Sequence, residues 1–270
     1  MKVCVVTGGG SGMGLEAARS MPNDRIFLLS GRTRSKLEKA AEVLKDNDRK
    51  SYIKTCDTSD RKQVHELARY AASLGEVTNV INAAGLSPSM ADPEKLLRVN
   101  ALGTVYVNRE FAKVMKSGVI VDISSNSAYK LPKMMIPKKT YTLAEKHEQQ
   151  FIDKLLKICG IIKDKYKRSG LAYALSKNFV IWYAEKSAFE LGTRGIRVCS
   201  LSPGLIATEM GELEKGEGSA MLEHTAERRM GTPQELGFAI AMAADERNGY
   251  LAGVDILVDD GSTKGNRHLQ

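Results

Sequence analysis

The sequence lacks the features that mark membrane, secreted and metal-binding proteins. It contains no run of about 18 apolar residues, so we expect no transmembrane helix. No charged region, apolar stretch and cleavage site follow one another near residue 1, so we expect no secretory signal. The four cysteines and four histidines lack the spacing of a disulfide framework or a metal site. We therefore expect reduced thiols, no bound metal and a cytoplasmic location.

Most of the chain also has little excess charge. The formal net charge is +8, but residues 129–168 hold eleven of the 40 Lys and Arg residues and only four of the 32 Asp and Glu residues. The rest of the chain is close to neutral. This segment has no long one-sided helix that is both basic and aromatic, so we expect neither nucleic-acid nor membrane binding. The lysines form either a solvated face or a docking surface for an anionic substrate or partner.

Short apolar runs alternate with amphipathic stretches along the chain. The pattern predicts strands at 2–6, 25–30, 52–55, 77–81, 119–123, 196–201 and 254–258. It predicts helices at 15–21, 35–46, 60–74, 93–116, 171–191 and 233–244. This alternation indicates an α/β fold, a doubly wound parallel sheet of the Rossmann type in a single domain over 1–270.

Residues 129–168 break the alternation. Residues 130–140 contain Pro and Met and are expected to be irregular, whereas 143–166 have apolar residues three or four apart. This spacing predicts one or two helices packed on the body, with an interruption near Gly160 and lysines outward. We therefore expect a basic helical insertion at 129–168.

A glycine-rich turn follows the first strand and precedes the first helix. It runs from Thr7 to Gly14 and contains Gly8, Ser11, Gly12 and Met13. Strand, glycine turn and helix form the setting in which backbone N–H groups face a pyrophosphate at a helix N-terminus. We expect a dinucleotide to bind here.

The end of the second strand lacks the carboxylate that binds a ribose 2′-hydroxyl in many dinucleotide-binding folds. Instead, Arg32 and Arg34 follow Ser30-Gly31. Because a guanidinium suits a 2′-phosphate, we expect NADP(H) rather than NAD(H).

Small or polar residues follow the later strands at their carboxyl ends, where open α/β sheets bind ligands. These residues are Asp57, Asn82, Ala83, Gly85, Ser125, Pro203, Gly204 and Thr208. The stretch after the sixth strand is rich in Met and Gly, so we expect residues 205–232 to form a substrate lid. Its apolar side chains either line an apolar pocket or pack in the core.

Tyr173 and Lys177 are four positions apart within a predicted helix and therefore share one face. An ammonium beside a phenol favours the phenolate and lowers the phenol pKa from ~10 toward the working range of a general acid or base. Such a pair is common on helix surfaces, and the other motifs give it meaning.

Together these motifs resemble the short-chain dehydrogenase/reductase superfamily in its single-domain branch. The matching residues are Thr7–Gly14, Asn82-Ala83-Ala84-Gly85, Asn100, Ser125, Tyr173 with Lys177, Pro203-Gly204 with Thr208, and the terminal Gly253 with Val258-Asp259-Asp260-Gly261. The resemblance covers nearly the whole chain apart from 129–168. Asp260 stands where a glycine is common.

The resemblance implies a role for each catalytic residue. Tyr173 would exchange a proton with the substrate oxygen, and Lys177 would lower its pKa and bind the nicotinamide ribose. Ser125 would hydrogen-bond the substrate oxygen, and Asn100 would hold a water in the proton relay. The 203–204 segment and Thr208 would touch the nicotinamide end of the cofactor, and Asp57 the adenine end.

The spacing between Ser125 and Tyr173 is wider than in typical members, and the excess is the basic segment. This resembles the subgroup of bacterial 3α-hydroxysteroid dehydrogenase/carbonyl reductase, which carries a helical insertion there. That resemblance implies a bulky apolar ketone or secondary alcohol such as a steroid. It also implies a homo-oligomer in which a dimer is favoured over a tetramer. The alternatives are a 3-oxoacyl-carrier or coenzyme A reductase and a non-catalytic NADP(H)-sensing protein.

Overall fold

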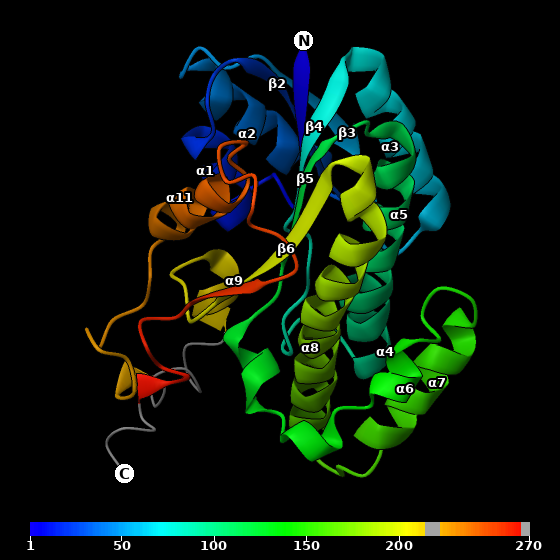
Figure 1. Cartoon of the computed structure of the whole chain (residues 1–270). Coiled ribbons are helices and arrows are strands. Elements are labelled where there is room, and N and C mark those ends of the chain that lie inside the picture. Colours follow the sequence, from blue (N-terminus) through cyan, green and yellow to red (C-terminus); the bar gives the residue numbers. More distant parts are fainter. Residues whose placement is uncertain (214–221, 266–270) are drawn as a thin grey trace.

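Seven parallel strands form one sheet at the centre of the molecule (Figure 1). The computed structural model describes residues 1–213 and 222–265. The strand order is β3-β2-β1-β4-β5-β6-β7. The strands are β1 Lys2–Thr7, β2 Arg25–Gly31, β3 Ser51–Thr55, β4 Glu76–Asn82, β5 Gly118–Ile123, β6 Ile196–Pro203 and β7 Asp255–Val258. All seven predicted strands are confirmed, with ends shifted by one or two residues at most.

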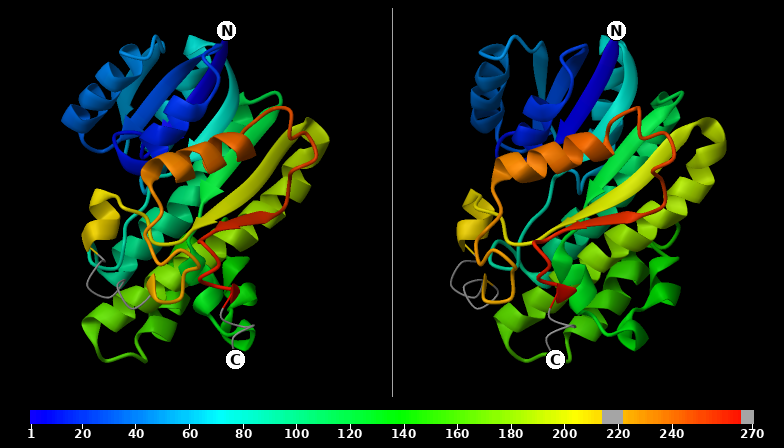
Figure 2. Two further views of the ribbon diagram at one scale, coloured as in Figure 1. Left: turned by 90° about the vertical axis from the view of Figure 1, so that its left-hand side faces the viewer. Right: turned by 60° about the vertical axis from the view of Figure 1, so that its left-hand side comes forward.

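Helices cover both faces of the sheet (Figures 1 and 2). One face carries α1 Gly12–Ser20, α2 Arg34–Lys45 and α11 Pro233–Ala243. The other face carries α3 Arg61–Leu74, α5 Gly103–Val114 and α8 Lys165–Leu191. Each layer buries its own apolar cluster against the sheet, because strands covered on both faces are apolar on both sides. The doubly wound Rossmann fold is therefore confirmed.

The strand order reverses direction between β1 and β4. β1 pairs with β2 on one side and with β4 on the other, and Thr7 stands opposite both Ser30 and Asn82. In open α/β sheets the crevice at such a reversal, outside the carboxyl ends of the strands, is where ligands bind. This geometry places the predicted glycine turn beside the residues that follow β4.

The predicted continuous helix over 93–116 is wrong in one respect. A short helix, α4 Pro93–Leu96, passes into a π-helical segment, Leu97–Leu102, before α5 begins. Asn100 lies in the π-helical segment, and its side-chain amide bonds both backbone groups of Leu86, at 2.9 and 3.0 Å. A π-bulge of this kind is frequent at functional sites. The helix propensities of its residues do not reveal it in the sequence.

The basic segment contains two helices, α6 Lys138–Tyr141 and α7 Glu148–Cys159. Gly160 stands at the end of α7, as expected. Helix α8 begins at Lys165 and not at Leu171, because the Asp164 side chain accepts a hydrogen bond from the Lys167 N–H and so caps an earlier turn. The region expected to be irregular contains two 3₁₀ turns, Asn126–Lys130 and Lys133–Met135, in addition to α6.

Helices α6 and α7 pack on the outer side of α5 and α8. The rings of Tyr141 and Phe151 contact Phe179 of α8, with centroids 5.2 and 5.0 Å apart. Phe151, Leu155 and Cys159 are fully buried, so that part of the predicted apolar stripe does pack on the body.

A polar contact reinforces this packing. The Glu145 carboxylate, which follows α6, pairs with Arg109 of α5 and with Lys186 of α8. It also accepts a hydrogen bond from the Tyr183 hydroxyl at 2.9 Å. The basic segment is therefore anchored to the two helices that it covers.

Candidate active site

The turn after β1 requires glycine at positions where the chain approaches other backbone. Gly8 has φ +66°, and a Cβ there would lie 2.6 Å from the Ala83 carbonyl oxygen. A Cβ on Gly14 would lie 2.7 Å from the Gly8 carbonyl oxygen. Helix α1 begins at Gly12, and the Ser11 side chain at its N-cap makes no capping bond. The first N–H groups of α1 therefore face a crevice without a side-chain partner, which suits a phosphate.

Two basic side chains border this crevice at the end of β2. Arg32 and Lys36 line it, whereas Arg34 is directed to Glu38 one turn further along α2, at 2.8 Å. Lys36 also pairs with Glu209 of α9 (Glu209–Leu213) across the crevice, at 2.6 Å. Of the two arginines in the sequence motif, only Arg32 lines the crevice.

The crevice is a cleft of about 530 Å³. Asp57 lines it, and partial burial raises the pKa of this carboxyl, but hydrogen bonds from Ser59 outweigh burial and leave the pKa below its ordinary value. The cleft brings together ten of the residues predicted to bind a cofactor: Gly8, Ser11, Gly12, Met13, Gly14, Arg32, Asp57, Ala83, Gly85 and Thr208.

Asn82 and Asn100 line neither this cleft nor a second cleft that adjoins it, which is described below. Both are buried. Asn82 accepts a hydrogen bond from the Thr7 hydroxyl at 2.9 Å and donates one to Asp122 at 2.8 Å. Asn100 holds the backbone of Leu86, a residue that does line both clefts. The structure thus places both asparagines as supports beneath the loop that follows β4.

A second cleft, of about 560 Å³, adjoins the first and shares residues such as Met13, Gly85 and Thr208 with it. Ser125, Tyr173 and Lys177 all line this second cleft. Pro203 and Gly204, which follow from β6, line it as well. Residues 48 positions apart in the sequence, Ser125 and Tyr173, thus border one space that continues into the first cleft.

Lys177 lies beneath Tyr173 on the same face of α8. Its ammonium is 5.8 Å from the centre of the Tyr173 ring and donates a hydrogen bond to the Ile123 carbonyl at 2.8 Å. Burial lowers the pKa of Lys177 to about 8, while the nearby Asp122 carboxylate acts in the opposite direction. A lysine with such a pKa can change its charge near neutral pH, so it can influence proton transfer at Tyr173.

No sequence motif pointed to Asp122, which lies in β5 behind this site. It is fully buried, and burial raises its pKa to about 6, against hydrogen bonds from Asn108 and Asn82. Lys36 is a second residue that the motifs did not single out. Its position in the first turn of the helix that follows Arg32 is the signal that could have found it, because that turn begins directly at the end of β2.

The segment predicted as a lid begins beside the second cleft. Leu205, Ile206, Met210 and Gly211 line the cleft. The two ends of the segment are tied together, since Gly231 N–H bonds the Leu205 carbonyl and Ala207 N–H bonds the Gly231 carbonyl. Residues 214–221 of the predicted lid lie outside the described residues.

Asp260, for which no role was predicted from the sequence, also contacts this segment. It has φ +50°, a backbone conformation that favours glycine. Its carboxylate accepts a hydrogen bond from the Glu227 N–H, at 2.8 Å. The residue thus joins the end of β7 to the predicted lid.

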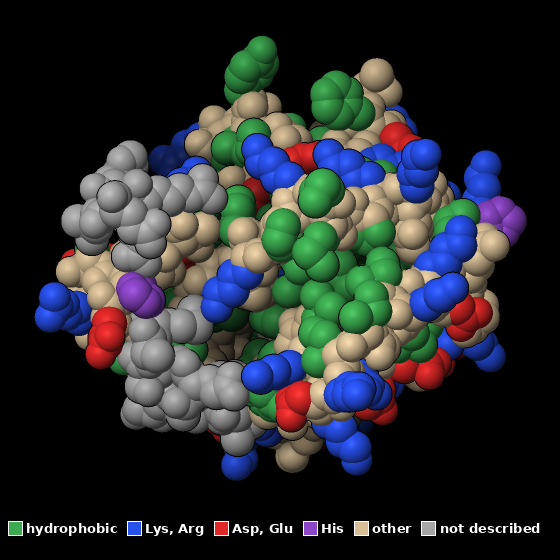
Figure 3. Space-filling view, turned by 90° about the horizontal axis from the view of Figure 1, so that it is seen from below, with side chains coloured by type: hydrophobic (Ala, Val, Ile, Leu, Met, Phe, Trp, Pro, Cys, Tyr) green, Lys and Arg blue, Asp and Glu red, His purple; other side chains and the backbone are tan. Residues whose placement is uncertain are grey.

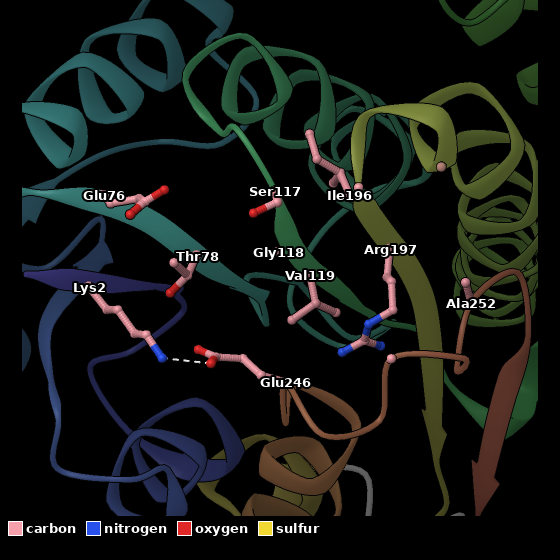
Figure 4. A pocket seen from close by; sticks show the side chains of 13 residues that line it. Lys2, Glu76, Thr78, Ser117, Gly118, Val119, Ile196, Arg197, Glu246 and Ala252 are labelled. Atoms are coloured by element: carbon pink, nitrogen blue, oxygen red, sulfur yellow. Dashed lines mark hydrogen bonds and ion pairs between the residues drawn. The ribbon is translucent and has the colours of Figure 1, made fainter.

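Another cleft, of about 610 Å³, opens at the amino ends of the strands, at the opposite edge of the sheet (Figure 4). Three of its charged side chains, Lys2, Arg197 and Glu246, already have partners. Lys2 pairs with Glu246 at 2.6 Å, and Arg197 donates to the carbonyls of Leu251 and Asp245. None of the predicted site residues lines it, so we assign the chemistry to the carboxyl edge.

Fold and cleft together define a nucleotide-binding α/β protein with a Tyr–Lys pair next to the nucleotide site. Comparison with known families agrees with this class. Residues 2–137 match the family model described as short chain dehydrogenase, and residues 158–263 match the model described as enoyl-(acyl carrier protein) reductase. The chain therefore belongs to the short-chain dehydrogenase/reductase family, whose members are oxidoreductases that use nicotinamide cofactors. The two matches leave out residues 138–157, which include α6 and most of α7.

Similar proteins span the same length. The short-chain dehydrogenase/reductase bsc3 of Alternaria brassicicola is 28% identical and covers 94% of this chain and 93% of its own. The 3-oxoacyl-[acyl-carrier-protein] reductase FabG of Rickettsia conorii is 25% identical over 96% of both chains. The structure of a short chain dehydrogenase from Burkholderia cenocepacia in complex with NADP superposes with a TM-score of 0.77 at 19% identity, over 97% of both chains. At that identity the superposition establishes the fold alone.

Proposed function

We propose that this protein interconverts a ketone and a secondary alcohol with NADP(H) as the hydride carrier. One observation carries the proposal: Ser125, Tyr173 and Lys177 line one cleft that continues into a crevice with free helix N–H groups and a basic rim. The bound cofactor supplies the hydride. The protein supplies orientation, hydrogen bonds and a proton.

Tyr173 gives its proton to the carbonyl oxygen during reduction and removes one from the alcohol during oxidation. Ser125 donates a hydrogen bond to the same oxygen and stabilises the charge that develops there. Lys177 favours the tyrosinate by its positive charge and reaches the nicotinamide ribose. For Asn100 we propose the role of holding a relay water, next to the Leu86 backbone that its side chain binds.

The cofactor preference rests on Arg32, with Lys36 beside it. Both side chains line the cleft at the end of β2. Residues 30–34, which end this strand and follow it, contain no carboxylate that could bind a ribose 2′-hydroxyl. The similar Burkholderia protein also binds NADP. We expect Arg32→Ala to weaken NADPH binding by roughly 10- to 100-fold, because a charge-assisted hydrogen bond is lost, and to leave NADH binding within about twofold. Titration of cofactor fluorescence measures both, and equal losses for the two cofactors would contradict the preference.

The substrate is proposed to be bulky and apolar, such as a steroid. The second cleft supports this, since Leu86, Leu131, Leu171, Leu205, Ile206 and Met210 line it. Residues 205–232 are proposed to close over it as a lid. The likeness to a 3-oxoacyl-[acyl-carrier-protein] reductase supports a second candidate, reduction of a 3-oxoacyl thioester.

NADPH oxidation with a panel of ketosteroids, aromatic ketones and a 3-oxoacyl thioester tests these candidates. Turnover of a ketosteroid supports the first, and turnover of the thioester alone replaces it with the second. If the protein bound NADPH tightly but turned over none of these substrates, the result would favour the hypothesis of a non-catalytic cofactor-sensing protein.

We also propose a cytoplasmic dimer. The four cysteines are buried and unpaired, which fits a reducing compartment. Helices α6 and α7 cover the outer side of α5 and α8, through contacts such as that of Glu145 with Arg109. Part of that surface is therefore covered, and we expect this cover to disfavour a tetramer built on it. Sedimentation velocity should give a dimer, and a tetramer would contradict the proposal.

A further inference from the structure

A patch of apolar side chains lies beside the hollow at the carboxyl end of the sheet, with lysine and arginine side chains around it (Figure 3). Met134, Met135 and Ile161 are 95%, 53% and 81% exposed. Single exposed apolar side chains are common, but a group of them beside a cleft marks an interaction surface.

Two segments far apart in the sequence build this patch at the mouth of the substrate cleft. Residues 130–139 carry Met134 and Met135, and residues 161–168 carry Ile161. Leu131 of the first segment and Tyr166 of the second line the same cleft. The mouth of the cleft is thus bordered by both. We call the two segments together the basic–apolar patch.

The charge of the basic–apolar patch is predominantly positive. Residues 130–139 contain four lysines and no acidic residue, and 161–168 contain three lysines and one arginine against one aspartate. The aspartate, Asp164, caps α8 through the Lys167 N–H at 2.8 Å. Lys133, Lys138, Lys139, Lys163, Lys165 and Lys167 are exposed.

We infer that the basic–apolar patch docks on an anionic phospholipid surface, with the mouth of the cleft facing the bilayer. Met134 and Ile161, which are 95% and 81% exposed, can insert at the boundary between the headgroups and the acyl chains. The lysines around them can pair with the lipid phosphates. A second copy of the chain would bring like charges together at this face, which disfavours it. A folded acidic protein would satisfy the lysines, but it would also need pockets for the projecting Met134 and Ile161 side chains.

Docking on a bilayer would deliver substrate to the cleft, and this role rests on the apolar substrate proposed above. Apolar ketones concentrate in bilayers, so a cleft that opens toward the lipid receives them without passage through water. The sequence predicted no membrane binding because it lacks one continuous basic and aromatic helix. The fold instead assembles the surface from a turn and a helix start that are about 30 residues apart in the chain.

Vesicle flotation tests the docking without cofactor or substrate, so its result is independent of turnover. The probes are vesicles of phosphatidylcholine alone and of phosphatidylcholine with phosphatidylserine. We expect binding only to the anionic vesicles, with a steep loss at high salt. Each lysine contributes about fivefold in affinity near such a surface, so Lys133→Gln/Lys138→Gln/Lys163→Gln should reduce binding on the order of 100-fold.

Matched variants separate the two components of the surface. Met134→Ser/Ile161→Ser keeps the charge and should reduce binding about tenfold or more, because apolar burial is lost. Lys39→Gln/Lys62→Gln, on other exposed faces, and Phe238→Ser, an exposed apolar residue on α11, should bind like the parent protein. Circular dichroism of each variant confirms that it is folded.

Three results would overturn the inference. The first is no binding to anionic vesicles at low salt. The second is unchanged binding of Met134→Ser/Ile161→Ser, which would reduce the contact to charge alone. The third is binding of an acidic acyl carrier protein through the same lysines in the absence of vesicle binding, which would assign the surface to a protein partner.

Discussion

The two ends of the active-site cleft are built in different ways. At the nucleotide end, backbone sets the shape: Gly8 and Gly14 are positions where a Cβ would meet carbonyl oxygens at less than 3 Å. At the substrate end, side chains set the shape, and they come from several separate places, among them the loop after β4, the turn after β5, the start of α8 and the segment after β6. The nucleotide end is therefore fixed by a local motif, whereas the substrate end depends on how distant segments meet.

The largest effect expected at one end alone is that of Tyr173→Phe. The change removes only the hydroxyl that exchanges the proton, so turnover should fall about 1,000-fold. The NADPH dissociation constant should stay within about threefold, since the nucleotide end is untouched. Steady-state kinetics on a ketone substrate and cofactor titration measure the two quantities.

Tyr129→Phe is the matched control, because Tyr129 bonds Asp255 and does not line either part of the cleft. It should retain most of its turnover. If Tyr173→Phe also retained turnover near that of the parent, the acid/base assignment would be wrong.

Gly8→Ala tests the opposite end. Gly8 has φ +66°, and its Cβ would lie 2.6 Å from the Ala83 carbonyl oxygen, so the turn must move. We expect a loss of about 1–3 kcal/mol in the free energy of unfolding and at least tenfold weaker cofactor binding. Gly170→Ala is the control, because nothing lies within 4 Å of its Cβ on α8 and alanine favours a helix by up to about 1 kcal/mol. Similar losses in the two variants would show that the backbone approach at Gly8 does not limit binding.

The difference between the two ends also explains what the sequence predicts. Strands that are apolar throughout and a glycine turn are local signals, so the sheet and the residues of the nucleotide cleft follow from them. Tyr173 with Lys177 is local as well, since one turn of helix brings them together.

The remaining features depend on contacts across the fold. The π-helical segment around Asn100 depends on the backbone of Leu86, which comes from another loop. Asp122 gives no signal in β5, because its meaning comes from Asn82 and Asn108 on neighbouring elements. The basic–apolar patch has the same origin, since its two halves are separated in the chain by residues 140–160, which include all of α7. A pattern read along one segment does not contain such pairings.

Glu145→Gln tests whether the basic segment is independent of the nucleotide end, and its effect should be the smallest. Burial raises the pKa of Glu145, but hydrogen bonds from Arg109, Lys186 and Tyr183 outweigh burial and hold the pKa at about 2. Loss of the charge should cost about 1–3 kcal/mol in the free energy of unfolding at neutral pH, and cofactor affinity should not change. Urea denaturation and NADPH titration measure these. Glu190→Gln is the control, because Glu190 pairs with the same Lys186 at an exposed position, and it should cost at most about 0.5 kcal/mol.

The pH dependence gives the sign of this contribution. An ordinary glutamate in the unfolded chain titrates near ~4.3, and Glu145 in the folded protein titrates at about 2. The lower folded pKa means that the stabilisation is complete above ~4.3 and is lost as the pH falls toward 2. The difference between the parent protein and Glu145→Gln should therefore be constant from neutral pH to about 5 and shrink below ~4.3. A difference that persisted unchanged at pH ~3 would show that shape, and not the carboxylate charge, holds the basic segment on α5 and α8.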